Sequence, residues 1–337
     1  MRRLARRTAL GAPPLGSPEW DDRATAADVL ACFRLLLGRA PNPEERRGHL
    51  AQAGQALPGV VAGYLNSLEF ARRDLFRPGA DDAAEIAERA GYRMYASPGD
   101  ALIGRHVLAG AYEPEVEAVF RRLLRPGMGV VDIGANIGVF ALLSASLVGP
   151  EGHVLAIEPN PANARMLEAS RRLNGFAHLV TAQVAAGRET GLLVLNTTHS
   201  NGTTSSPGQD PSSLLGAQTV PCLAVDVLVD PARRVDLIKV DVEGAEYNAL
   251  LGAAGVIGRD RPAIVSEFSP SLMPGISGID GPGYLRFLCG LGYGLGVIEG
   301  NGEVTGVGTD VDAVMSAYAA RGTDHIDILA TLLEREQ

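Results

Sequence analysis

The chain has 337 residues, of which 46% are hydrophobic and 20% charged, a composition typical of a globular protein with one large and one small domain. Its net charge of −9 argues against a general attraction to nucleic acid, so no nucleic-acid partner is expected. The three cysteines form no Cys-x-x-Cys pair and indicate neither a disulfide framework nor a zinc knuckle. No stretch approaches the roughly 20 apolar residues of a transmembrane helix, and a cytoplasmic location is expected.

The first ninety residues predict three segments. Residues 1–23 are basic but lack the apolar run of a signal peptide, and they are expected to form a disordered tail. Residues 24–78 have apolar positions at helical spacing and predict a small all-α module. Within it, about fifty residues resemble a short bacterial helical module of unassigned function, so its protein partner is unknown. Residues 79–90 are expected to be a linker.

From Gly91 onward, short β-rich runs alternate with helical stretches, which is typical of βαβ units and a mostly parallel sheet. The fold class predicted is therefore α/β, with a doubly wound, mostly parallel, Rossmann-like sheet in residues 91–337. Strands are expected at 129–133, 153–157, 179–184, 235–240 and 263–267, and helices at 137–148, 160–174 and 243–252. The polar stretch 196–216, which contains His199, is either a disordered insert or a functional lid.

A cofactor site is predicted where the first of these strands ends. Asp132 is followed by Gly-Ala-Asn-Ile-Gly, so that Gly134 and Gly138 let the backbone pass close to a ligand. A dinucleotide site would have Gly-x-Gly-x-x-Gly, whereas Asn136 stands at the middle glycine and a carboxylate precedes the turn. This arrangement is poor for a pyrophosphate and favours a ligand with positive charge.

Glu158 ends the next strand, where a carboxylate can bind both hydroxyls of a ribose. Adenosine carrying a cationic sulfonium therefore fits better than a dinucleotide. No acid follows the third strand to meet the adenine amine, so the backbone or Gln183 would have to serve. The alternative interpretations are an ordinary tight turn for the glycines and a helix N-terminal acid for Glu158.

Four ordered motifs carry a family resemblance: Asp132-Ile-Gly-Ala-Asn-Ile-Gly138, Ile157-Glu-Pro-Asn160, Asp236-Leu-Ile-Lys-Val-Asp-Val-Glu-Gly-Ala-Glu246 and Ile264-Val-Ser-Glu267. Together they resemble the FkbM family of S-adenosyl-L-methionine-dependent methyltransferases, whose class I fold is Rossmann-like. The resemblance implies that Gly134, Asn136 and Gly138 line the methionine end of the cofactor, with Asp132 near its ammonium group and Glu158 on the ribose. Tyr112 and Glu113 would close over the cofactor.

The catalytic candidates lie around the only lysine of the chain, Lys239, in the segment that also contains Asp241 and Glu243. We hypothesise that Asp241 orients or deprotonates an acceptor hydroxyl while Lys239 sets its ionisation and Glu243 and Glu267 assist. The competing interpretation is a buried ion pair of Lys239 with Asp241 or Glu267 that ties strands together. No metal is predicted, although Asp241 and Glu267 could hold a hard divalent ion.

The function predicted is that of a methyltransferase acting on an oxygen of a sugar, glycan or other hydroxylated metabolite, where the choice of oxygen comes from the resemblance alone. One alternative is a nucleotide-dependent oxidoreductase on the same kind of sheet, which the Gly-Ala-Asn-Ile-Gly turn disfavours. The other is a non-catalytic binding protein that acts through its helical module.

Overall fold

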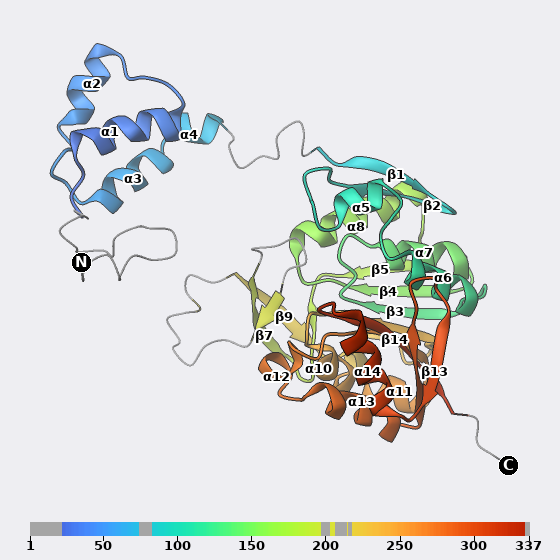
Figure 1. Ribbon diagram of the computed structural model, residues 1–337. Coiled ribbons are helices and arrows are strands. Elements are labelled where there is room, and N and C mark those ends of the chain that lie inside the picture. The colour runs from blue at the N-terminus through green and yellow to red at the C-terminus, as the bar shows by residue number, and fades with distance from the viewer. Residues whose placement is uncertain (1–21, 74–82, 197–202, 206–213, 215–217, 334–337) are drawn as a thin grey trace, which may run out of the picture. The chain divides into compact units, whose positions relative to one another are not determined.

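The computed structural model describes residues 22–73, 83–196, 203–205, 214 and 218–333. It divides into two compact units, Met1–Asp81 and Asp82–Gln337, which are described separately (Figure 1). Most of the expected basic tail lies outside the described residues. Among the described residues, no helix combines the length and apolar composition that crossing a membrane requires.

The first unit is helical in its described part. Its elements are α1 (Ala26–Cys32), the π-helical turn η2 (Phe33–Leu37), α2 (Pro43–Leu50), α3 (Leu57–Leu65) and α4 (Leu68–Arg73). Side-chain caps begin two of them: Thr25 and Asp28 form a capping box on α1, and Asn42 and Glu45 form one on α2. Phe33 is buried in the centre of the unit, where the helices pack around it.

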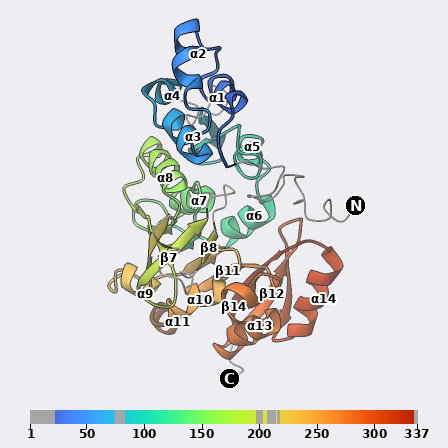
Figure 2. The same ribbon diagram turned by 90° about the vertical axis from the view of Figure 1, so that its left-hand side faces the viewer.

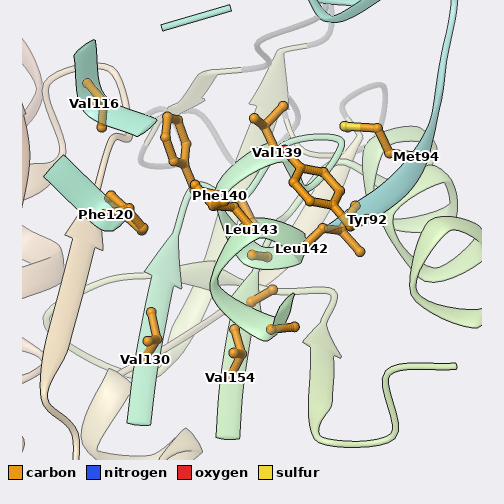
Figure 3. Packing of buried hydrophobic residues seen from close by; sticks show 14 of the residues in the cluster. Tyr92, Met94, Val116, Phe120, Val130, Val139, Phe140, Leu142, Leu143 and Val154 are labelled. Atoms are coloured by element: carbon orange, nitrogen blue, oxygen red, sulfur yellow. The ribbon is translucent and has the colours of Figure 1, made fainter. Parts of the chain in front are cut away.

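The second unit begins with a β-hairpin of β1 (Glu85–Arg89) and β2 (Tyr92–Ala96). The expectation of a linker over 79–90 is therefore wrong for β1. Gly91, with φ +102°, turns the chain between the strands. Alternate residues of β2 are buried, and Figure 3 shows Tyr92 and Met94 beside α7 (Val139–Val148), so hydrophobic burial holds this segment to the domain.

An eight-stranded mixed sheet forms the centre of the second unit. In sheet order its strands are β13 (Val304–Gly308), β12 (Tyr293–Ile298), β14 (Ile326–Leu332), β11 (Ala263–Phe268), β10 (Leu237–Val240), β3 (Gly129–Ile133), β4 (His153–Ile157) and β5 (Leu179–Ala182). The strands β11, β10, β3, β4 and β5 are mutually parallel, at nearly the expected positions. The antiparallel strands β14, β12 and β13 extend the sheet beyond the expected parallel part.

Helices cover both faces of this sheet (Figures 1 and 2). One face packs against α6 (Pro114–Leu123), α7 and α8 (Pro161–Asn174). The other packs against α9 (Val225–Leu228), α10 (Glu246–Leu251), α11 (Ala254–Asp260), α13 (Gly281–Gly290) and α14 (Val311–Arg321). In Figure 3, Phe120 of α6 and Phe140 and Leu142 of α7 lie above the valines of β3 and β4. The short helices α5 (Gly104–Leu108) and α12 (Met273–Ile276) complete the set.

A second sheet of four short strands was not expected from the sequence. Its order is β6 (Ala185–Ala186), β9 (Thr219–Leu223), β7 (Gly191–Asn196) and β8 (Thr203–Ser205). Strand β8 lies within the polar stretch 196–216, and it pairs with β7 in an antiparallel hairpin. The expectation of a disordered insert or a functional lid concerns residues, His199 among them, that mostly lie outside the described ranges.

The strand order creates a crevice at one edge of the main sheet. Neighbouring strands β3 and β10 are parallel, but the chain leaves β3 through α7 on one face and leaves β10 through α10 and α11 on the other. The loops that follow the two strands therefore diverge. Ligands of open α/β sheets bind at such a switch point, outside the carboxyl ends of the strands.

Candidate functional site

A cavity of about 330 Å³ opens at this switch point, at the carboxyl ends of β3, β4, β10 and β11. It is lined by all but one of the site residues expected from the sequence: Tyr112, Glu113, Asp132, Gly134, Asn136, Glu158, Lys239, Asp241, Glu243 and Glu267. Residues that are more than 150 positions apart in the chain thus share one cavity. Gly138 is the expected residue that does not line it.

The two glycines of the turn after β3 have different roles. Gly134 has φ +82°, and a Cβ there would lie 1.8 Å from the carbonyl oxygen of Asp241, so the glycine lets the two loops approach closely. Gly138 has φ +97°, and its Cβ would lie 2.3 Å from Cδ1 of Leu167 in α8. Gly134 therefore shapes the cavity, whereas Gly138 permits helix packing behind it.

Asn136 and Glu158 are joined across the turn. Asn136 has a left-handed backbone with φ +50°, and its N–H donates to Oε2 of Glu158 at 2.8 Å, while the N–H of Asn160 donates to Oε1 at 2.7 Å. Glu158 is 3% exposed, and burial raises its pKa to about 7 against these hydrogen bonds. The side chain of Asn163 also hydrogen-bonds this carboxylate, whose remaining acceptor capacity suits a hydroxyl group.

Asp132, unlike Glu158, accepts no hydrogen bond from a neighbouring backbone N–H group among the described residues. It is 1% exposed, and neither carboxylate oxygen makes a hydrogen bond within the part of the chain that the structure describes. Burial raises its pKa to about 6; the charge of Lys239 opposes this shift and that of Asp241 adds to it. A buried carboxylate without donors is costly, so this position fits a ligand that brings a positively charged donor.

Lys239 and Asp241 form an ion pair in which the lysine is buried and the aspartate is partly exposed. Nζ of Lys239 lies 2.8 Å from Oδ2 of Asp241 and 4.8 Å from the ring centre of Phe140. Burial would lower the pKa of Lys239, but the carboxylates of Asp241, Glu113 and Asp132 raise it well above the usual range. Burial likewise opposes ionisation of Asp241, and Lys239 outweighs it, so the pKa of Asp241 is lowered.

Glu267 lies beside this pair as a partly buried carboxyl group. Burial and the charge of Asp241 raise its pKa well above the usual range, and it shares a hydrogen bond with Asp241. Ser269 Oγ donates to Oε1 of Glu267 at 2.6 Å. Burial also raises the pKa of Glu113 to about 8, and it raises that of Tyr112. The charge of one lysine, Lys239, thus acts on several acids of the cavity.

Sequence reasoning missed several lining or supporting residues, among them Glu246, Thr204 and His325. Glu246 is fully buried at the start of α10, and its Oε1 accepts the N–H groups of Val242 and Gly244 at 3.0 Å, which holds the loop that carries Glu243. Because the loop continues to Ala245, α10 begins three residues later than expected. Thr204 of β8 and His325, just before β14, also line the cavity.

The sequence contains a signal for only one of these three residues. An acid in the first turn of a helix, as Glu246 is in α10, is a favoured residue type at that end. Thr204 and His325 reach the cavity through strands that the sequence did not predict. At the adenine position, Ala185 and Ala186 line the cavity, whereas Gln183 is not among the lining residues.

Residues 132–295 match the family model of the Methyltransferase FkbM domain. A relative named Methyltransferase 1, from Beauveria bassiana (strain ARSEF 2860), is 32% identical over 144 residues, covering 36% of this chain and 57% of the relative. The chain thus spans little more than half the length of the curated relative it matches.

Two solved structures are similar at low identity. Methyltransferase FkbM from Methylobacillus flagellatus KT has 17% identity and a TM-score of 0.39, covering 67% of this chain and 52% of its own. M. jannaschii TYW2 in complex with AdoMet has 14% identity and a TM-score of 0.41, and the match covers 74% of this chain and 85% of that structure's chain. The match to the family model, over residues 132–295, is what links this chain to the FkbM methyltransferase domain.

Proposed function

We propose that the chain transfers a methyl group from S-adenosyl-L-methionine to a hydroxyl oxygen of a small acceptor of the sugar or glycan class. The observation that carries this proposal is that two buried carboxylates, Asp132 and Glu158, line the cavity near the turn at Gly134. Asp132, which has no hydrogen-bond partner among the described residues, fits the ammonium group of the cofactor, and the buried carboxylate of Glu158, held by the N–H groups of Asn136 and Asn160, fits its ribose. The choice of oxygen rests on the family resemblance.

The acceptor would bind on the side of the cavity where Asp241 lies. The bound cofactor supplies an electrophilic methyl group on a sulfonium. Asp241, kept ionised by Lys239 at 2.8 Å, would accept the hydroxyl proton as the new carbon–oxygen bond forms. A general base contributes about 10²- to 10⁴-fold, whereas positioning contributes about 7–11 kcal/mol, so the walls of the cavity matter more than the base.

A nucleotide-dependent oxidoreductase is the weaker candidate. A pyrophosphate would have to lie at the turn after β3, where the buried carboxylate of Asp132 would repel it. Asn136 also stands where the second glycine of a dinucleotide site would allow close approach.

Calorimetric titration of the purified chain with S-adenosylmethionine, S-adenosylhomocysteine and NADH tests the proposal. We expect micromolar binding of both adenosyl ligands and none of NADH. Glu158→Ala should abolish that binding, whereas Glu151→Ala, at an exposed position outside the cavity, should not change it. Binding of NADH alone would replace the proposal with the oxidoreductase, and no binding at all would favour a non-catalytic protein.

A further inference from the structure

The cavity is lined by more negative than positive side chains. Besides the two carboxylates proposed to bind the cofactor, its acidic lining residues are Glu113, Asp241, Glu243, Glu267 and Asp324. Lys239 is the one permanent cation among the described residues that line the cavity, and its ammonium group is already paired with Asp241. His325 lies 2.9 Å from Asp324 through its Nδ1, so its nearest partner is also an acid.

Arginine is missing from the lining, although it is abundant in the chain. The sequence contains 30 lysines and arginines, all of them arginine except Lys239, yet no arginine lines the cavity within the described ranges. Guanidinium groups are the usual partners of phosphate and carboxylate groups, because they bind both oxygens at once. The cavity therefore offers no matched partner to a phosphorylated, sulfated or carboxylated acceptor.

We propose that the acceptor is an amino sugar whose protonated amino group binds between Glu243 and Glu267, beside the hydroxyl group that Asp241 receives. This inference rests on the proposed function and narrows its substrate class. The hydroxyl groups of Thr204, Ser269 and Ser271 line the same cavity and supply partners for the remaining sugar hydroxyls.

The position of Glu243 supports this role. Its backbone has φ +53°, a conformation that glutamate rarely adopts, and Glu246 fixes the N–H groups on either side of it. The loop thus keeps Glu243 at the cavity wall. Glu267 is held from β11 by the hydrogen bond from Ser269.

Proton release provides an independent sign of ammonium binding. Burial and the neighbouring charge of Asp241 raise the pKa of Glu113 to about 8, against the charge of Lys239, and raise that of Glu267 well above its usual range. An ammonium group that enters would favour their ionised forms and expel protons to the buffer. A neutral sugar brings no charge and should release none.

The test compares three sugars that differ mainly in charge: glucosamine, glucose and glucuronate. Each is titrated into protein saturated with S-adenosylhomocysteine, and binding is followed by saturation-transfer NMR and by calorimetry in two buffers of different ionisation enthalpy. We expect glucosamine to bind about tenfold more tightly than glucose, the ratio of one charge-assisted hydrogen bond, with proton release. Glucuronate should bind most weakly. Equal binding of glucosamine and glucose, preference for glucuronate, or no binding of any sugar would overturn the inference.

A matched pair of variants locates the effect. Glu243→Gln keeps the shape of the side chain and should remove most of the preference for glucosamine, while S-adenosylhomocysteine still binds. Glu151→Gln, at an exposed position away from the cavity, should leave the preference unchanged. If S-adenosylhomocysteine fails to bind the unaltered protein, the proposed function itself is wrong; if it binds and charge has no effect, only the amino-sugar inference is wrong.

Discussion

Lys239 and Asp241 lie two residues apart at the end of β10, with Nζ and Oδ2 separated by 2.8 Å and the lysine side chain only 4% exposed. Alternate residues of a strand face the same side, so the pair meets on the face that carries α7 and Phe140. The pair is a salt bridge by geometry, and it also lines the cavity in which we propose catalysis. The structural role of an ion pair and the catalytic role proposed for Asp241 therefore involve the same side chains, and the variants below distinguish the two roles.

Replacing Lys239 with methionine should lower the free energy of unfolding by about 3–5 kcal/mol, because buried carboxylates lose their cation. Denaturation with urea measures this change. The double variant Lys239→Met with Asp241→Leu removes both charges and should recover much of the stability without activity. A Lys239→Met protein as stable as the unaltered chain would contradict the importance of the ion pair.

Replacing Asp241 with asparagine should slow methyl transfer by about 10²- to 10⁴-fold, because an amide cannot take the hydroxyl proton. Binding of S-adenosylhomocysteine should persist, since Asp241 is not proposed to contact the cofactor. Single-turnover transfer to an identified acceptor and calorimetry measure the two effects. Asp312→Asn, at an exposed position in α14, is the matched control. Full turnover by Asp241→Asn would leave Asp241 only a structural role.

Gly134 and Gly149 offer a paired test of the close approach between loops. Both have positive φ, +82° and +66°, so alanine at either position should cost about 1–2 kcal/mol of backbone strain. At Gly149 nothing lies within 4 Å of the new Cβ, whereas at Gly134 the Asp241 carbonyl oxygen lies 1.8 Å away. Gly134→Ala should therefore destabilise the protein by about 1–3 kcal/mol more than Gly149→Ala. Equal melting temperatures would show that the two loops separate easily.

Glu158 should make the stability of the ligand-free protein depend on pH. Its pKa rises from 4.5 to about 7 in the folded chain, mainly through burial, so the folded state binds the proton more tightly than the unfolded state. This contribution is fully present below about pH 4.5 and is lost as the pH rises through about 7, to a total of about 3 kcal/mol.

Glu158→Gln isolates this effect, because Asp132 and the other buried acids titrate in both proteins. Calorimetric melting between about pH 5 and about pH 8 should show a smaller loss of stability in the variant than in the unaltered chain. Parallel pH profiles would mean that Glu158 is already ionised at low pH.

The sequence predicted the central strands well, because strands buried on both faces are short apolar runs ending in polar residues. The run before Asp132 and the run containing Lys239 fall within one or two residues of β3 and β10. It predicted the hairpin at Glu85–Arg89 poorly, since β1 is largely exposed and only its partner strand has a clear apolar alternation. The antiparallel strands β12, β13 and β14 were not predicted from the sequence.

By itself, the sequence determined which chemical groups the site contains, because glycines and carboxylates that follow buried strands must gather at one edge of a parallel sheet. Only the tertiary structure decided what each group does there. Gly134 faces the cavity while Gly138 packs on Leu167, Glu246 supports the loop of Glu243, and His325 arrives from a distant strand. These differences depend on contacts between segments far apart in the chain, and local patterns carry no information about such contacts.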